Sequence, residues 1–309
     1  MKIFKPKFWN KKKGLIAIAL LPISIFLQIF ASLKNQFINK KKFSIPVIGV
    51  GNIYIGGTGK TPLSIEIVKI LEKLNKKPAI IKKAYEEHND EFRLIRSKKV
   101  TLFKNNLRYK AINEAIKNDF DCVVLDDGFQ DFSISKSLDI LCFNEKQLVG
   151  NEMTLPSGPL REPLSSLKKC QIIMINGKVN VAFEKKIKDI SNNVKIFYMK
   201  YFPINIEDFK DHDLLAFAGI GSPENFFNLL EENNLKIIKK ISFPDHYNYS
   251  LKELNELILY ATKHGLKIIT TEKDFFRINH LQLSKIQYLS VELKILNKNS
   301  FQKEMLSYL

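Results

Sequence analysis

Short apolar runs alternate with amphipathic stretches along most of the chain. The runs at 47–51 and 121–126 are rich in β-branched and aliphatic residues, which is typical of buried strands in a parallel sheet. Helical spacing follows at about 63–74 and at 108–117. This alternation predicts an α/β fold. Further strands are expected at 78–81, 100–103, 139–143, 172–176 and 194–198.

A second, smaller α/β unit is predicted in the last third of the chain, after a hinge at 203–213. Its expected elements are a strand and turn at 214–221, a helix at 222–233, a strand at 236–241, a helix at 251–263 and a strand at 267–271. The expected domains are a membrane-associating segment at 1–44, a P-loop NTPase-like α/β/α domain at 45–205 and a C-terminal α/β domain at 206–309.

The N-terminal segment is both basic and apolar. Six lysines lie within residues 1–13, and the apolar stretch 14–33 is long enough to span a bilayer. A signal peptide is disfavoured because no cleavage signal follows, and a single span would leave one of two lysine-rich flanks on the unfavourable side. We expect a helix that enters one leaflet, kinked near Pro22, with its lysines on anionic head groups. A single span and a buried core helix are the alternatives.

A glycine-rich turn at 51–59 has the pattern of a phosphate-binding loop. It follows an apolar run, and Lys60 and Thr61 open the next helix. Lys60 would reach the β- and γ-phosphates of a nucleotide, and Thr61 would place its hydroxyl on Mg²⁺. A turn without a ligand is the alternative, because the strict motif would have glycine at Tyr54. The residues expected to bind ATP are Gly56, Gly57, Thr58, Gly59, Lys60 and Thr61.

Asp126 and Asp127 end a buried strand, as in a Walker B motif. The carboxyl end of that strand would bring them near the Mg²⁺ held by Thr61. Adjacent strand residues face opposite ways, so one of the two is expected to contact the metal. Asp90 follows another strand and is a candidate general base, with a solvated charge cluster as the alternative. His246, next to Asp245, is a candidate that a carboxylate could orient, or else a surface histidine.

Composition narrows the classes of partner. The net charge of +17 suits an anionic membrane surface or a nucleic acid, but only five of the 49 basic residues are arginines. Because nucleic-acid readers depend on arginine for bidentate contacts, a nucleic-acid-dependent ATPase is disfavoured. Cys122, Cys142 and Cys170 are expected to be buried free thiols. The proline-rich segment 155–164 is either a rigid ligand-binding loop or a connector.

Taken in order, these motifs closely resemble the tetraacyldisaccharide 4'-kinase family, the lipid A 4'-kinases of Gram-negative bacteria. The resemblance covers nearly the whole chain, and the family writes the loop with the same shifted glycines. The motifs that carry it are Val50-Gly51-Asn52, Gly56-Gly-Thr-Gly-Lys-Thr-Pro62, Asp90-Glu91, Asp126-Asp-Gly-Phe-Gln130, Leu155-Pro-Ser-Gly-Pro-Leu-Arg-Glu-Pro163, Phe217-Ala-Gly-Ile-Gly-Ser-Pro-Glu224, Phe243-Pro-Asp-His246 and Thr270-Thr-Glu-Lys-Asp274.

The resemblance implies ATP- and Mg²⁺-dependent transfer of phosphate to the 4'-hydroxyl of a tetraacyldisaccharide 1-phosphate at the cytoplasmic face of the inner membrane. It implies that Asp90 is the base and that His246 pairs with it across the domain cleft, while Lys60 serves the γ-phosphate. No obligate protein partner is expected. The residues expected at the acceptor or its phosphate are Tyr85, Glu91, Arg108, Gln130, Arg161 and Glu162.

The chain departs from the family pattern at two places. Lys83-Ala84-Tyr85-Glu86 stands where the family has Arg-Gly-Tyr-Gly, with a shortened loop before Asp90. Asp131 stands where the family has histidine, and its charge would be unfavourable near polyanions unless a cation or the metal offsets it. A membrane-docked nucleotide switch without kinase activity is the alternative function.

Overall fold

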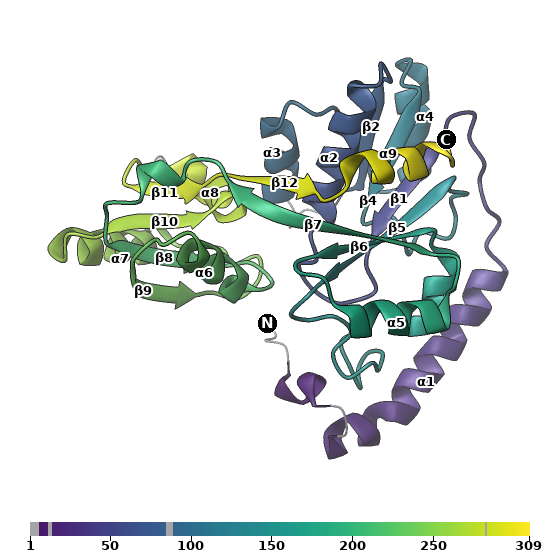
Figure 1. The fold of residues 1–309 in the computed structure, drawn as a ribbon, viewed down its shortest axis with the longest axis horizontal. Helices are drawn as coiled ribbons and strands as arrows, with labels where there is room; N and C mark the ends of the chain where they lie inside the picture. The colour runs from purple at the N-terminus through teal and green to yellow at the C-terminus, as the bar shows by residue number, and fades with distance from the viewer. Residues whose placement is uncertain (1–5, 12–13, 85–88, 282) are drawn as a thin grey trace. The chain divides into compact units, whose positions relative to one another are not determined.

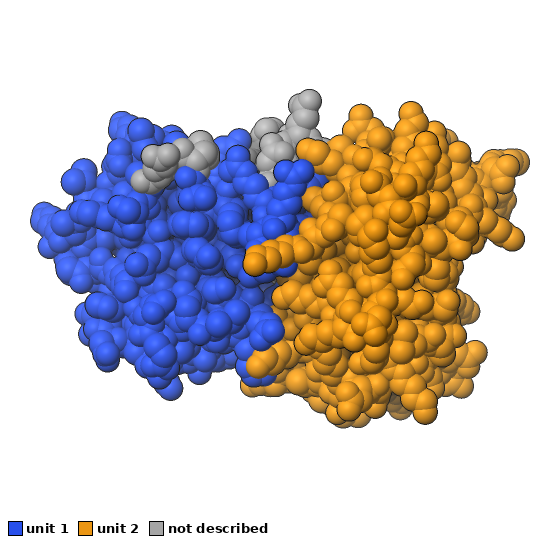
Figure 2. All heavy atoms as spheres, turned by 90° about the horizontal axis from the view of Figure 1, so that it is seen from above, with its two compact units in different colours: residues 1–4, 85–98, 201–292 blue, residues 5–84, 99–200, 293–309 orange. Residues whose placement is uncertain are grey.

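The computed structural model describes residues 6–11, 14–84, 89–281 and 283–309. They form two compact units, coloured separately in Figure 2. The main unit contains 6–84, 99–200 and 293–309, and the small unit contains 89–98 and 201–292. The described residues of the small unit thus come from two separate stretches of the chain. The domain boundaries expected from the sequence, after residues 44 and 205, stay predictions.

An eight-stranded sheet forms the centre of the main unit, in the order β12-β7-β6-β5-β1-β4-β2-β3 (Figure 1). All neighbours from β7 to β3 pair in parallel. Its strands are β1 (Val47–Gly51), β2 (Pro78–Lys83), β3 (Leu102–Asn105), β4 (Cys122–Asp126), β5 (Leu138–Asn144), β6 (Ile172–Asn176), β7 (Lys195–Pro203) and β12 (Val291–Ile295).

The sheet core follows from the apolar runs. Every residue of β1 and β4 is buried, as expected for central strands covered on both faces. Helix α2 (Lys60–Glu72) contacts β1, β2 and β4, whereas α4 (Arg108–Lys117) and α5 (Val181–Ile190) contribute apolar side chains to two separate core clusters. The remaining helices of this unit are α1 (Leu15–Gln36) and α9 (Lys298–Leu306), and the segment Leu164–Lys169 is a 3-10 helix.

The small unit has a four-stranded parallel sheet in the order β11-β10-β8-β9. Its core lies between β8 and the helices α6 and α7. Its elements are β8 (Leu214–Ala218), β9 (Ile237–Ser242), β10 (Lys267–Thr271), β11 (Ile286–Leu289), α3 (Asn89–Ser97), α6 (Pro223–Glu232), α7 (Leu251–Lys263) and α8 (Glu272–Ile278).

Most predicted elements are confirmed within a few residues, including the helix that opens at the glycine-rich loop, which begins three residues earlier than expected. Helices α3, α5, α8 and α9 and strands β11 and β12 were not predicted. The three cysteines are buried free thiols, as expected.

Helix α1 buries almost nothing against the rest of the main unit. Only Ala17 and Ser24 are buried, and their spacing of seven residues puts them on one face. Apolar side chains on the other faces are exposed, with Phe26 at 67% and Phe30 at 61%. Among the described residues, α1 is the one helix long and apolar enough to cross a membrane.

The buried face of α1 is fixed by polar contacts to the loop at 151–160. The hydroxyl of Ser24 donates to the carbonyl of Thr154 at 3.0 Å and accepts from the backbone N–H of Ser157 at 3.0 Å. The side chain of Gln28 donates to the hydroxyl of Thr154, and the indole N–H of Trp9 donates to the carbonyl of Pro156 at 3.1 Å. A core helix would bury its apolar faces, so the core-helix alternative is wrong.

A buried carboxylate fastens the strand ends of the small unit. Asp274 is fully buried and accepts from the backbone N–H of Gly219 at 3.0 Å and the hydroxyl of Tyr249 at 2.9 Å. It also accepts from the hydroxyl of Thr271 and from the guanidinium of Arg277, each at 2.7 Å. These donors come from β10, α8 and two loops, so one side chain joins them all.

Replacing Asp274 with alanine should lower the free energy of unfolding by about 3–5 kcal/mol, because the charge of Arg277 would be left buried beside unsatisfied donors. Urea unfolding followed by circular dichroism measures this loss. Exposed Asp211→Ala is the matched control, with an expected change below about 0.5 kcal/mol. Equal stability of the two variants would contradict the assigned role of Asp274.

Candidate functional site

The glycine-rich loop joins the carboxyl end of β1 to the start of α2. Strand β1 lies between β4 and β5 in the sheet. The connection after β1 runs toward β2, whereas the connection after the neighbouring β5 runs the opposite way, toward β6. Ligands of open α/β sheets bind outside such points. Gly59 has a φ of 94°, a left-handed conformation that glycine adopts without strain. The chain can therefore turn sharply there, and Lys60 begins α2 at the carboxyl ends of β1 and β4.

Asn52 is a fully buried hub of the loop. Its amide nitrogen donates to the carbonyl of Gly56 at 3.1 Å and to the hydroxyl of Thr58 at 3.0 Å, which holds the turn in shape. Its amide oxygen accepts from the ammonium of Lys60 at 3.2 Å and from the guanidinium of Arg161 at 3.1 Å. A neutral side chain thus holds two cations together without neutralising either.

Asp126 occupies the buried side of the site. Its Oδ2 atom accepts from the hydroxyl of Thr61 at 2.9 Å and from the ammonium of Lys82. Lys82 is itself only 5% exposed and lies at the carboxyl end of β2, the neighbour of β4. Hydroxyl, carboxylate and ammonium therefore meet at one point beside the start of α2.

Asp127 faces the other two cations. It has a φ of 54°, so the chain has left the strand geometry. Its Oδ1 atom lies 2.9 Å from the guanidinium of Arg161 and 3.3 Å from the ammonium of Lys60. Burial acts to raise the pKa of Asp127, but the charges of Lys60, Arg161 and Lys82 outweigh it and lower the pKa well below its usual value. Asp127 therefore stays ionised.

The proline-rich segment is bound to the glycine-rich loop along its backbone. The N–H of Arg161 donates to the carbonyl of Ile53 at 2.7 Å, and the N–H of Ile55 donates to the carbonyl of Pro159 at 2.9 Å. Between them, Tyr54 forms an antiparallel bridge with Leu160. These contacts hold the guanidinium of Arg161 at the loop, which favours the ligand-binding alternative over a plain connector.

Arg108 offsets the charge of Asp131. Its guanidinium lies 3.2 Å from the carboxylate of Asp131 and donates to the carbonyls of Asp126 at 3.3 Å and Asp127 at 2.8 Å. The cation that this departure from the family pattern required is thus present. Gln130 likewise binds the backbone of the site, since its amide nitrogen donates to the carbonyl of Asn52 at 2.7 Å.

Glu162 lies beside Arg161 with only 13% of its side chain exposed. The nearest cation that the described part of the structure pairs with it is Lys169, whose ammonium is 3.9 Å away. Its other oxygen, Oε1, is buried without a hydrogen-bond partner among the described residues.

The small unit contains the remaining candidates. Glu91 lies on α3 and forms an ion pair of 2.6 Å with Lys273, and Lys98 forms one of 2.5 Å with Glu272. Together they fix α3 to α8. The backbone of Asp90 lies in the first turn of α3, but its side chain is outside the described part, as is the whole of Tyr85.

His246 lies in the loop after β9, with a φ of 54°. Its backbone N–H donates to the carbonyl of Gly219 at 3.1 Å, and its Nε2 atom lies 3.9 Å from the carboxylate of Asp245. Asp90 and His246 belong to the same compact unit. The cleft expected to separate them is therefore not a boundary between these units.

The main unit thus brings together Lys60, Thr61, Asp126, Asp127 and Arg161, with the glycine-rich loop beside them. Sequence reasoning missed two residues that contact this group, Asn52 as its hub and Lys82 as the partner of Asp126. Asn52 could have been found from its place in the family motif, whereas one lysine among many gave no signal for Lys82.

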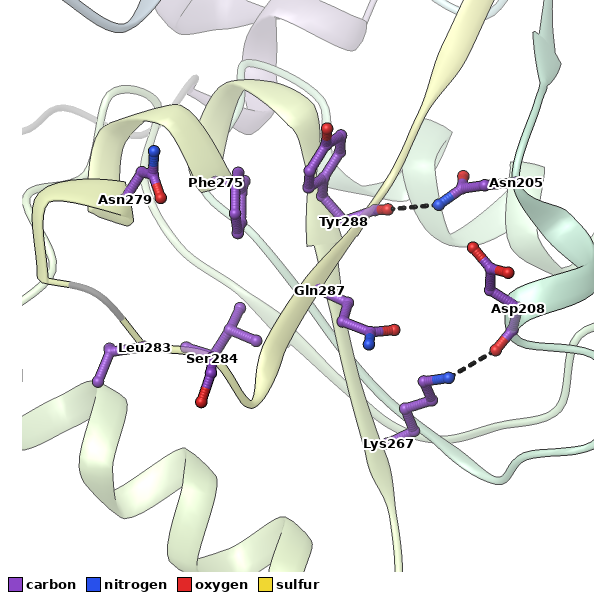
Figure 3. A pocket seen from close by; sticks show the side chains of 10 residues that line it. Asn205, Asp208, Lys267, Phe275, Asn279, Leu283, Ser284, Gln287 and Tyr288 are labelled. Atoms are coloured by element: carbon purple, nitrogen blue, oxygen red, sulfur yellow. Dashed lines mark hydrogen bonds between the residues drawn. The ribbon is translucent and has the colours of Figure 1, made fainter.

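A pocket of about 760 Å³ opens elsewhere in the small unit (Figure 3). None of the predicted site residues is among the described residues that line it. Two of its polar side chains bind the protein itself, since Asn205 donates to the carbonyl of Tyr288 and Lys267 donates to the carbonyl of Asp208. The glycine-rich loop, and not this pocket, is therefore the candidate active site.

Comparison with known families shows to which family the chain belongs. The family model for tetraacyldisaccharide-1-P 4'-kinase matches residues 16–309. The chain belongs to this family. The resemblance and the fold expected from the sequence are thereby confirmed, and kinase activity is favoured over a nucleotide switch.

Individual members of the tetraacyldisaccharide-1-P 4'-kinase family agree along almost their whole length. The tetraacyldisaccharide 4'-kinase of Pelagibacter ubique (strain HTCC1062) is 43% identical over 313 residues, covering 99% of this chain and 98% of that protein. That of Rickettsia canadensis (strain McKiel) is 31% identical, covering 99% and 97%. The crystal structure of LpxK from Aquifex aeolicus in complex with ATP shares the fold, with a TM-score of 0.73 at 22% identity, covering 95% of this chain and 99% of that one.

Replacing Asn52 with alanine should weaken ATP binding about tenfold, because the turn loses two hydrogen bonds and Lys60 and Arg161 lose their shared acceptor. Equilibrium binding of a fluorescent ATP analogue measures the loss. Asn193→Ala, at an exposed position, is the control and should bind like the unaltered protein. Undiminished affinity in Asn52→Ala would contradict its assignment as the hub.

Proposed function

We propose that this protein transfers the γ-phosphate of ATP to the 4'-hydroxyl of tetraacyldisaccharide 1-phosphate, a step of lipid A biosynthesis. The observation that carries the proposal is the cluster of Lys60, Thr61, Asp126, Asp127 and Arg161 at a glycine-rich loop, in a chain of this family. Relatives that match along the whole chain are named for this activity.

The loop residues suit a nucleotide triphosphate. The backbone N–H groups from Gly56 to Thr61 and the start of α2 supply donors for phosphate oxygens. The ammonium of Lys60 and the guanidinium of Arg161 both contact the carboxylate of Asp127. A phosphate oxygen could take the place of that carboxylate oxygen as their acceptor. We propose that these two cations move from Asp127 and Asn52 to the β- and γ-phosphates, where they would stabilise the charge that develops during transfer.

Thr61 and Asp126 fit a magnesium ion. A hydroxyl and a carboxylate are oxygen ligands, and their atoms already lie 2.9 Å apart at the start of α2. No group of three or more acidic, histidine or cysteine side chains surrounds them among the described residues, which agrees with an ion that takes its other ligands from water and phosphate. Bound there, Mg²⁺ supplies neutralisation of the β- and γ-phosphate charge. Asp127, which Lys60 and Arg161 would release on moving to the phosphates, is the second candidate ligand of the ion.

Proton removal is assigned to Asp90, with His246 as its partner. Asp90 would accept the proton of the 4'-hydroxyl as that oxygen attacks the γ-phosphorus and ADP leaves. A histidine near a carboxylate can keep it oriented and ionised. The ion pair of Glu91 with Lys273 supports this role indirectly, because it helps to fix the helix that carries Asp90.

The other candidate residues are assigned either to the acceptor or to the support of the phosphate site. Arg161 and Glu162 lie on the loop that is bound to the phosphate site and are proposed to serve the acceptor side as well. Arg108 and Gln130 bind the backbone of the site, so we propose that they act by holding Asp126, Asp127 and Asn52 in position. Tyr85 is kept as a candidate from the family motif alone.

Helix α1 is proposed to dock in the cytoplasmic leaflet of the inner membrane. Its exposed apolar faces would contact acyl chains, and Lys34 with the lysines at 40–42 would lie on anionic head groups. Since the acceptor is itself a lipid, this arrangement would bring the active site and its substrate to the same surface. A single span remains the alternative.

Incubation with labelled ATP, Mg²⁺ and tetraacyldisaccharide 1-phosphate in detergent micelles should give a product that carries phosphate on the 4'-oxygen. Mass spectrometry of the product locates the new phosphate. Product that forms only with the lipid acceptor supports the proposal. Binding of ATP without any transfer would refute it and leave the nucleotide switch as the better account.

The variants Asp90→Ala and His246→Ala should each lower kcat by about 10² or more while ATP binding is kept, as is usual when a general base or its partner is lost. Single-turnover kinetics and nucleotide binding are measured on the same preparations. His264→Ala is the control, since that exposed ring stacks on Tyr260 and is not one of the proposed site residues. Unchanged kcat in both test variants would remove the proposed pair.

A further inference from the structure

A buried ammonium lies against the carboxylate proposed to ligate the metal. Lys82 is 5% exposed and Asp126 is fully buried, and the two form an ion pair through Asp126 Oδ2. Burying a lysine is costly unless a counter-ion compensates it, so this pair is a specific feature of the site. The function proposed above gives Lys82 no role.

The pair involves the same atom that the metal would need. Asp126 Oδ2 accepts from both Thr61 and Lys82, while its Oδ1 atom lies 3.5 Å from the hydroxyl of Ser64. A divalent ion between Thr61 and Asp126 would therefore meet the ammonium of Lys82 at the same oxygen. Two cations held at one carboxylate oxygen in a buried place repel each other strongly, so each weakens the binding of the other.

The other cations of the site do not replace Lys82. Lys60 and Arg161 contact Asp127 and Asn52, whereas Asp126 forms its ion pair with Lys82. Lys60 and Arg161 thus pair with Asp127, whereas Lys82 pairs with Asp126 and acts on Asp127 through its charge alone. Nucleotide phosphates would add acceptors near this group of cations and could take the ammonium when the metal takes the carboxylate.

We infer that Lys82 is a positioning residue that acts as a resident counter-ion of Asp126, competing with Mg²⁺ for this carboxylate until the phosphates of a nucleotide attract the ammonium. This inference rests on the proposed function, because it assumes that Thr61 and Asp126 hold the metal. It makes divalent-ion binding depend on the nucleotide. The metal would enter the site with ATP or after it, and would bind poorly to the empty protein.

The test is the affinity for Mn²⁺, used as the paramagnetic probe for the Mg²⁺ site and measured by electron paramagnetic resonance with and without ADP. Lys82→Met removes the ammonium and keeps most of the side-chain volume. Without nucleotide, it should bind Mn²⁺ about tenfold more tightly than the unaltered protein, and ADP should enhance its binding less. Lys110→Met, at an exposed position of α4, removes the same charge and should change neither quantity.

Lys82→Gln serves as a second variant, because a neutral donor can keep a hydrogen bond to Asp126 if methionine disturbs folding. Tighter Mn²⁺ binding in either variant supports the inference. Unchanged or weaker binding in the folded variants, with normal ADP-dependent binding in the unaltered protein, overturns the role of Lys82 and leaves the proposed function intact. Absence of ADP-dependent Mn²⁺ binding in all proteins overturns both this inference and the proposed metal site.

Discussion

Neutralisation of two adjacent carboxylates is the constraint on which the site depends. Asp126 ends a strand that is buried along its length and Asp127 follows it, in a place where charge is costly unless it is paired. Each is compensated by cations from other elements: Lys82 from β2, Lys60 from α2 and Arg161 from the proline-rich segment. The same ion pairs that offset this cost also fix the cations near the glycine-rich loop.

The departure at Asp131 illustrates the same constraint. A further carboxylate near Asp126 and Asp127 would oppose the binding of a polyanion, yet it is paired with Arg108, whose guanidinium also donates to the backbone of both aspartates. The carboxylate of Asp131 therefore helps to position the guanidinium of Arg108, which in turn binds the backbone at the end of β4. Its effect on the phosphate region is reduced by a cation that is itself 9% exposed.

The sequence predicted those parts of the fold and the site that residues close together in the chain determine. A turn, a helix start and an apolar strand each leave a pattern within a few consecutive residues. These patterns located the glycine-rich loop, Lys60, Thr61 and the two aspartates. The hub role of Asn52 requires Arg161, which lies 109 residues away in the chain. Lys82 is one of many lysines, and only the pairing of β2 with β4 gives it a buried partner. Helix α3 is short, and its stability depends on tertiary contacts: Phe92, Leu94 and Ile95 are buried, and ion pairs from the helix and from the residue after it reach α8.

The polar contacts between α1 and the loop at 151–160 determine what removal of this helix would do to the protein. Ser24 satisfies backbone groups of Thr154 and Ser157, and that segment continues within a few residues to Arg161 at the phosphate loop. Cutting away the helix to obtain a soluble fragment would uncover buried peptide groups in a loop that supports the nucleotide site. The apolar N-terminus is thus a covering element of the catalytic unit, and truncation would alter the enzyme as well as its solubility.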